Sequence, residues 1–316
     1  MASPPEPSPT HRSACVRVGR DLATYLEAGP SKAREAVVLL HGFGAWAEVT
    51  WTPTLAALAP DHRVLAPDML GFGLTSKPDP SLLEGDDATS VEVAFLERFL
   101  DAVGVERATL VGASFGGALA LRLARAAGDR VDRLVLVGSM GLGRAIHPLY
   151  RALGSPLLGE RLSSVDRAGV ERLWKLAVDD PARVTPALLD RHLELLSEPG
   201  ALVAIEALRL EVDALGQRHP QTRALPFVPQ PTLLVWGARD RVFPLRHAFR
   251  AARRMPRAAV AVVPGCGHLP PIERPDRFNA ILADFLARGL PPPKPPAPRP
   301  AETPRGRPKA FSSGPA

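Results

Sequence analysis

The chain has 316 residues, of which 46% are hydrophobic and 23% are charged, and its formal net charge is +6. This balance predicts a globular protein with one large domain or two modest ones, and it excludes a chain that is disordered throughout. The two cysteines, Cys15 and Cys266, are too few for a small scaffold held together by disulfides.

The N-terminal segment is rich in proline, with four among the first ten residues. Since proline lacks the amide donor that regular structure uses, residues 1–14 are predicted to be disordered. The first 20 residues contain no apolar run typical of a secretory signal, and no stretch reaches the roughly 18 apolar residues of a membrane helix. The sequence therefore predicts a cytoplasmic protein without a membrane span.

Short apolar runs alternate with helical patterns along the body of the chain. Residues 15–26 predict two short strands around a turn, and further strands are predicted at 36–40, 63–67, 107–113, 132–137, 231–236 and 258–263. Apolar spacing near 3.6 predicts helices at 91–103, with Ser90 as N-cap, and at 115–127, 245–255 and 275–288. Residues 45–60, which contain Pro53, show no clear helix. The alternation predicts an α/β fold with a mostly parallel central sheet and helices on both faces.

One segment, residues 141–228, breaks this alternation and is named here the insertion. It shows no clear strand, but helical patterns at 168–178 and 200–215. Because it lies between two predicted strands, we expect it to form a helical cap over the edge of the sheet. The remaining core is then made of residues 15–140 and 229–289.

The C-terminal tail, residues 290–316, contains ten prolines, which predicts an extended and disordered appendage. It carries five basic side chains and one acidic one, so most of the net charge lies in the tail. No basic stripe interleaved with aromatic residues is present, and the sequence therefore predicts no nucleic-acid partner.

The motif Gly-Ala-Ser-Phe-Gly at 112–116 follows a predicted strand and opens a predicted helix. In this context the G-x-S-x-G spacing indicates a nucleophilic serine on a sharp turn, because the residues two before and two after the serine must be almost free of side chain. The helix that begins there also stabilises negative charge that develops nearby. Ser114 is therefore the candidate nucleophile.

An activated serine needs a base and a group that orients the base. Asp240 follows the predicted strand 231–236, and His268 follows the strand 258–263. Ser114, Asp240 and His268 stand in the chain order expected for this type of turn, and all three follow the carboxyl ends of strands, where open α/β sheets form their sites. The three residues are predicted to form a catalytic triad.

An oxyanion hole needs two backbone N–H donors. We expect one from Phe115, which follows the nucleophile, and the other from Phe43. The second donor lies in a loop where Gly42 and Gly44 allow the backbone to approach a substrate. His41 is expected to hold the shape of this loop.

Asp68 is expected to brace a tight turn near the site. It also allows a second interpretation, since residues 42–47 fit the G-x-G-x-x-A pattern of dinucleotide-binding folds and Asp68 ends a strand 21 positions later. That interpretation leaves Ser114, Asp240 and His268 without a role.

Three apolar residues, Trp46, Trp174 and Leu269, are candidates for lining a substrate pocket. Cys266 is predicted to be a small packing residue. The sequence predicts no cofactor and no metal, because four of the remaining histidines show no ligand spacing; these are His147, His192, His219 and His247.

With these residues in hand, the chain resembles the α/β-hydrolase superfamily over about residues 15–289. The matching segments are HGFG at 41–44, APDMLGFGLTSKP at 66–78, VGASFGG at 111–117, WGARDRVFP at 236–244 and GCGHLPPIERPDRFN at 265–279. The resemblance implies Ser114 as nucleophile, His268 as base and Asp240 as the residue that orients it.

Within that superfamily, the segments APDMLGFG and GCGH…ERPDRFN are similar to those of meta-cleavage product hydrolases, which split carbon–carbon bonds in vinylogous diketones. That subfamily usually has asparagine before the serine and tryptophan after the histidine, where this chain has Ala113 and Leu269. We therefore predict a serine hydrolase that cleaves apolar acyl or aryl carboxylic esters through an acyl-enzyme. Carbon–carbon hydrolysis is the first alternative, and a non-catalytic binding protein on the same fold is the second.

Overall fold

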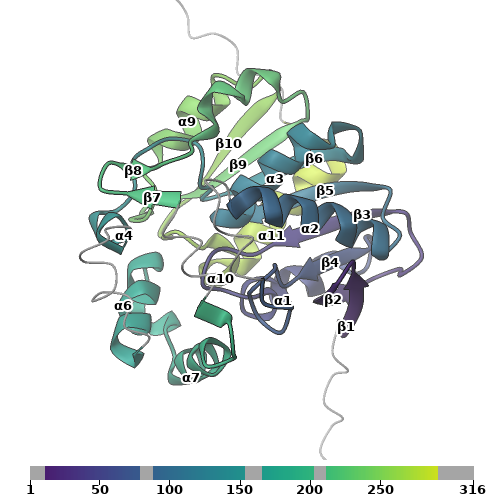
Figure 1. Cartoon of the computed structure of the whole chain (residues 1–316). Coiled ribbons are helices and arrows are strands. Elements are labelled where there is room, and N and C mark those ends of the chain that lie inside the picture. Colours follow the sequence, from purple (N-terminus) through teal and green to yellow (C-terminus); the bar gives the residue numbers. More distant parts are fainter. Residues whose placement is uncertain (1–10, 79–87, 154–165, 203–210, 291–316) are drawn as a thin grey trace, which may run out of the picture.

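The computed structural model describes residues 11–78, 88–153, 166–202 and 211–290. An eight-stranded mixed sheet forms the centre, with strand order β1-β2-β4-β3-β5-β6-β9-β10 (Figure 1). Its strands are β1 (Arg12–Val18), β2 (Asp21–Ala28), β3 (Glu35–Leu40), β4 (Val64–Pro67), β5 (Arg107–Ala113), β6 (Val131–Val137), β9 (Thr232–Gly237) and β10 (Ala258–Val263). Six neighbouring strands are parallel: β4, β3, β5, β6, β9 and β10. At one edge of the sheet β1 pairs antiparallel with β2, and β2 pairs antiparallel with β4. The predicted α/β fold is confirmed.

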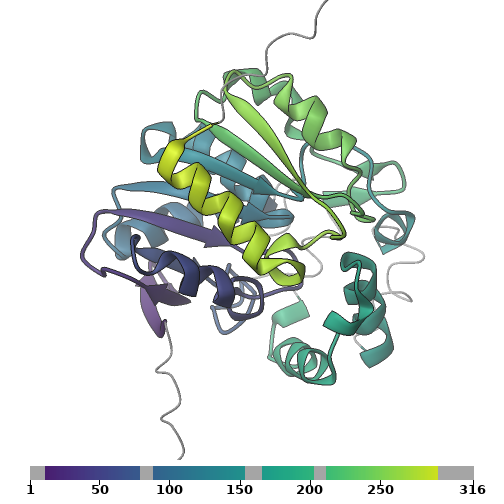
Figure 2. The ribbon, with the colours of Figure 1, turned by 180° about the vertical axis from the view of Figure 1, so that it is seen from behind.

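Helices cover both faces of the sheet, as Figures 1 and 2 show from opposite sides. One face carries α2 (Ala88–Ala102), α3 (Phe115–Ala126) and α9 (Arg246–Ala252), and the other carries α1 (Ala47–Leu58) and α11 (Pro275–Arg288). Strands such as β3 and β6 are apolar along almost their whole length because both of their faces are buried in this way.

Two predictions at helix starts are wrong. α1 begins at Ala47 although it contains Pro53; the Asp68 carboxylate accepts the N–H of Ala47 at 2.8 Å and so caps this helix from another part of the chain. α2 begins at Ala88, so that Ser90 lies inside the helix and not at its N-cap. The first strand also begins earlier than predicted, because Arg12 pairs with Glu27 of β2.

The insertion begins just after β6 and ends before β9. It holds the helices α4 (Pro148–Leu153), α6 (Arg167–Ala177) and α7 (Pro186–Leu196), of which α6 and α7 lie together beyond the sheet (Figure 1). Each of these two helices is capped by its own preceding residue: Asp166 accepts the N–H of Gly169, and Thr185 accepts that of Leu188. Short 3-10 turns lie at Gly128–Arg130, Pro181–Arg183, Gln221–Arg223 and Leu225–Phe227.

The insertion was predicted to contain no strand and to be helical up to residue 215. Both predictions are wrong for its C-terminal part. Residues 203–210 lie outside the described residues, but Val212–Asp213 (β7) and Gly216–Gln217 (β8) form a small antiparallel hairpin. Gly216 adopts a φ of 119°, and a Cβ there would lie 2.0 Å from the carbonyl oxygen of Arg144. The helical pattern ends at residue 211, and the close approach and left-handed backbone at Gly216 require glycine in the second strand of the hairpin.

Among the described helices, none is both long and apolar enough to cross a membrane.

Candidate active site

Ser114 occupies the sharp turn between β5 and α3. Its φ of 52° makes it the one non-glycine residue with positive φ in the described part of the chain. Two backbone bonds hold it there: its N–H donates to Val137 at 2.8 Å, and its carbonyl accepts from Met140 at 2.9 Å. A backbone conformation of this kind costs about 1–3 kcal/mol and persists where the surroundings over-determine it, which is typical of reactive positions.

The glycines around Ser114 are there for steric reasons. A Cβ on Gly112 would lie 2.3 Å from the carbonyl oxygen of Gly116, and a Cβ on Gly116 would lie 2.4 Å from that of Leu40. The strand, the turn and the first turn of the helix therefore touch through backbone alone. This is the crowding that the G-x-S-x-G spacing predicts.

Asp240 and His268 are bonded to each other. The Asp240 Oδ2 and the His268 Nδ1 are 2.9 Å apart, and both side chains are almost fully buried. The other carboxylate oxygen of Asp240 accepts the N–H groups of Val242 at 2.8 Å and Phe243 at 2.9 Å. Since the carboxylate only accepts, the proton of this pair belongs on Nδ1, and Nε2 of the neutral ring is free to accept a proton.

The end of β6 brings His268 toward the serine turn. A Cβ on Gly138 would lie only 2.9 Å from Nδ1 of His268. Val137, which precedes Gly138, and Met140, two residues after it, are hydrogen-bonded to the backbone of Ser114. The histidine ring also packs edge-on against Phe243, with centroids 5.3 Å apart.

The loop after β3 lies beside Ser114, the candidate nucleophile. A Cβ on Gly42 would lie 3.2 Å from Cβ and 3.9 Å from Oγ of Ser114. In the described residues the N–H groups of Phe43 and Phe115 donate to no protein acceptor. The assignment of these two amides to an oxyanion hole stays a prediction, and their free donors support it.

His41 and Asp68 hold the loops around the site through hydrogen bonds to backbone groups and to the Thr24 hydroxyl. The buried His41 ring contacts the carbonyl of Gly42 through Nδ1 at 2.8 Å and accepts the N–H of Met69 at Nε2 at 3.0 Å. Burial lowers the pKa of His41, which keeps the ring neutral. Asp68 bonds Thr24 in addition to the α1 N-terminus. Both side chains are thus occupied in bracing.

The three candidate pocket residues belong to one buried apolar cluster that joins the core to the insertion. Trp46 and Trp174 both pack edge-on against the ring of His192 in α7. The Nδ1 of His192 also accepts the indole N–H of Trp174 at 2.8 Å. Burial lowers the pKa of His192 to about 4. Leu269 lies elsewhere in the cluster, directly after His268.

Glu92 of α2 is a buried acid beneath the loop after β4. Its Oε2 accepts the N–H of Leu70 at 3.3 Å, and burial raises the pKa of Glu92 from 4.5 to about 8. Between these two pH values the folded protein keeps a proton that the unfolded chain has lost, so the free energy of unfolding falls as the pH rises and levels off above pH 8.

We expect Glu92→Gln to remove this pH dependence. The variant should unfold with about the wild-type free energy at pH 4, and at pH 9 it should be more stable than wild type by up to about 5 kcal/mol. Urea denaturation at the two pH values measures this difference. Glu97→Gln, on the same helix, is the matched control. A wild-type stability gap between pH 4 and pH 9 that Glu92→Gln leaves unchanged would contradict the expectation.

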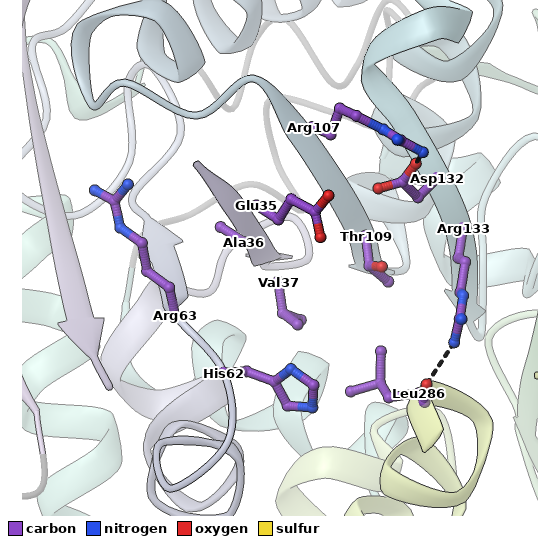
Figure 3. A pocket seen from close by; sticks show the side chains of 10 residues that line it. All are labelled: Glu35, Ala36, Val37, His62, Arg63, Arg107, Thr109, Asp132, Arg133 and Leu286. Atoms are coloured by element: carbon purple, nitrogen blue, oxygen red, sulfur yellow. Dashed lines mark hydrogen bonds and ion pairs between the residues drawn. The ribbon is translucent and has the colours of Figure 1, made fainter. Parts of the chain in front are cut away.

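A cavity of about 420 Å³ opens at the other end of the sheet, at the amino ends of the parallel strands (Figure 3). Its three arginines are already neutralised or bonded: Arg107 by Asp132, Arg63 by Glu27, and Arg133 by the carbonyls of Phe285 and Leu286. It contains no residue of the candidate triad, and it is separate from the site.

Sequence reasoning missed two residues near the site. His192 of α7 gives no spacing signal, because its neighbours Trp46 and Trp174 come from distant parts of the chain. Glu273 is fully buried. It lies in the motif GCGHLPPIERPDRFN, but the motif does not indicate which groups its carboxylate contacts. Within the described ranges, no three His, Cys, Asp or Glu side chains lie close enough together to hold a metal ion.

An eight-stranded mixed sheet with a serine on a strained strand–helix turn and an Asp–His pair beyond neighbouring strands defines the class of α/β hydrolases. A family model described as "Alpha/beta hydrolase family" matches residues 37–281. The chain belongs to the α/β hydrolase family.

The chain is similar to several named hydrolases. The chain is 34% identical over 260 residues to 2-hydroxymuconate semialdehyde hydrolase of Pseudomonas sp. (strain CF600), covering 79% of this chain and 86% of the relative. The solved structure of 2-hydroxy-6-oxo-6-phenylhexa-2,4-dienoate hydrolase from Rhodococcus sp. strain RHA1 superposes with a TM-score of 0.75 at 25% identity, covering 88% of this chain and 99% of that one. A membrane phospholipase A, a bacterial virulence factor, is also similar, with a TM-score of 0.73 at 27% identity and coverage of 88% and 86%.

Proposed function

We propose that this protein is a serine hydrolase that cleaves a carbon–carbon bond in a dienoate of the meta-cleavage product type. The relatives that carry this proposal are hydrolases of 2-hydroxymuconate semialdehyde and of a phenylhexadienoate. They favour the carbon–carbon alternative over the ester substrate that Ala113 and Leu269 suggested. The single observation that supports the mechanism is the bond between Asp240 and His268 at the edge of the sheet that also carries the strained Ser114.

In the first half of the reaction, His268 accepts the Ser114 proton at Nε2 while Oγ attacks the substrate carbonyl. Asp240 keeps the proton of the ring on Nδ1 and stabilises the imidazolium that forms. The N–H groups of Phe43 and Phe115 donate to the oxyanion, each contributing roughly 3–4 kcal/mol.

Before Ser114 attacks, the dienol substrate loses its enol O–H proton and takes up a proton at the CH next to the carbonyl, which gives a keto tautomer with CH₂ at that position. In the second half, the bond between the carbonyl carbon and this CH₂ breaks. The electron pair moves into the conjugated dienol system of the leaving fragment, and the proton held by His268 neutralises that fragment. Water then attacks the acyl group on Ser114 with His268 again as base, which releases a carboxylic acid. One water is consumed for each bond broken, so the atoms balance.

Ester hydrolysis is the second candidate, and the side chains beside the triad favour it. Ala113 and Leu269, which precede the nucleophile and follow the histidine, are buried and apolar. Neither offers a polar group that would recognise the enol oxygens of a dienoate. An ester needs only the triad and the oxyanion donors.

The deciding experiment compares kcat/KM for 2-hydroxymuconate semialdehyde and 2-hydroxy-6-oxo-6-phenylhexa-2,4-dienoate with that for p-nitrophenyl esters of increasing chain length. We expect at least one dienoate to be turned over with the higher kcat/KM. Turnover of the esters with no detectable dienoate cleavage would replace the proposal by the ester candidate. Failure of a fluorophosphonate to label Ser114 in the folded protein would refute the serine mechanism for both substrates.

A further inference from the structure

We propose that Glu273 is a positioning residue that sets the place of His268 by tying its loop to the insertion. This role rests on the proposed function, because it acts through the catalytic histidine. Glu273 ends the short helix α10 (Pro270–Glu273), lies five residues after His268 and is fully buried.

The Glu273 carboxylate joins two separate segments. Its Oε1 accepts the N–H of Gly267, the residue before His268, at 2.8 Å, and its Oε2 accepts the N–H of Asp179 at 2.6 Å. The thiol of the buried Cys266 donates to Oε1 as well, at 3.7 Å. Since every partner is a donor, the site suits an ionised carboxylate and no other side chain of this length.

The segment on the far side of Glu273 is the end of α6. The N–H of His268 itself donates to the carbonyl of Ala177 at 2.7 Å. A Cβ on Gly267 would lie 2.7 Å from that carbonyl and 2.7 Å from the N–H of Asp179. Backbone touches backbone at this junction, so the histidine loop has no room to shift while Glu273 holds it.

The loop that carries Asp240 is bonded to the same end of α6. Arg239 pairs with the Asp179 carboxylate at 3.0 Å, and Arg241 donates to the carbonyls of Lys175 and Val178. Both partners of the Asp–His pair are therefore anchored on one point of the insertion. The same helix carries Trp174, whose contact with His192 continues to Trp46 beside the oxyanion loop.

Loss of the Glu273 carboxylate should displace His268 without removing it. A shift of about 1 Å in a reacting group costs about 10²-fold in rate. Glutamine offers one accepting oxygen and can satisfy only one of the two amides, so its effect should lie between those of wild type and alanine.

The test uses the full chain with Glu273→Ala and Glu273→Gln. Fluorophosphonate labelling of Ser114 is followed for its second-order rate constant and its final extent, together with kcat and KM on p-nitrophenyl acetate and thermal denaturation. We expect the labelling rate and kcat to fall by about 10²-fold in Glu273→Ala and about 10-fold in Glu273→Gln, with complete labelling and KM within about 3-fold of wild type. If the alanine variant fails to fold, the glutamine variant decides.

Asn279→Ala is the matched control. Asn279 accepts from Thr54 and donates to Pro53, so its removal breaks tertiary bonds between α11 and α1 without touching the triad. It should lower the melting temperature and leave the labelling rate unchanged. A Glu273 variant that labels incompletely but at the wild-type rate would overturn the positioning role. If wild type itself is not labelled, the serine mechanism fails and this role fails with it.

Discussion

Replacing Ser114 by alanine is expected to lower kcat by at least about 10⁴-fold, because His268 then has no hydroxyl to deprotonate and no acyl-enzyme forms. The fold should persist, since the contacts that hold residue 114 are made by its backbone to Val137 and Met140. Steady-state kinetics on the better of the two substrate classes measures the loss of kcat, and circular dichroism tests whether the fold persists.

Ser139→Ala is the control for this substitution. Ser139 is a buried serine whose hydroxyl donates to the carbonyl of Met140, close to the same turn. It should keep kcat within a few-fold of wild type. Substantial activity in Ser114→Ala would contradict the nucleophile assignment and would revive the interpretation of the chain as a non-catalytic binding protein. A further variant, Ser114→Gly, should be equally inactive, but it should remove the backbone strain that a positive φ imposes on serine.

The second large effect is expected for Asp240→Asn, with a loss of about 10⁴-fold in kcat. The reason lies in how the carboxylate is held. Oδ1 accepts two backbone N–H groups, from Val242 and Phe243, and Oδ2 faces His268. The amide oxygen of asparagine will take the place that accepts the two N–H groups, so its NH₂ group must face Nδ1.

That orientation forces Nδ1 to accept and moves the ring proton to Nε2, where the base must instead be free. The variant should fold like wild type because every buried backbone donor keeps its partner. Asp101→Asn, which breaks an exposed ion pair with Arg130, is the control. Comparable losses of kcat in the two variants, or a wild-type kcat in Asp240→Asn, would contradict the assignment. Kinetics with thermal denaturation of both proteins provides the comparison.

Much of the architecture was predictable because its signals are local. The strand 107–113 and the turn after it are both predicted by consecutive residues, namely an apolar run and the glycines two before and two after Ser114. Buried parallel strands need continuous apolar runs, and a strained turn needs small neighbours. Asp240 and His268 were predictable for a related reason, since each directly follows such a run, and parallel strands bring their carboxyl ends to the same edge of the sheet.

Other features depend on contacts between distant segments. The start of α1 was missed because its cap is the carboxylate of Asp68, which lies 21 positions after Ala47. The hairpin at 212–217 was missed because it depends on a distant partner, the carbonyl of Arg144, which accepts the N–H of Gln217 at 2.9 Å. Propensity within a segment is overridden in both cases by a partner that the segment itself does not contain.

The sequence by itself determined the α/β class, the candidate nucleophilic serine on its turn and the order of the three predicted catalytic residues, because these follow from the period of apolar residues and the size of single side chains. Only the tertiary structure decided that Glu273 joins Gly267 to Asp179, and that His192 lies between Trp46 and Trp174. The physical reason is that hydrogen-bond partners and ring contacts are set by positions in space, and residues 94 positions apart carry no mark of being neighbours.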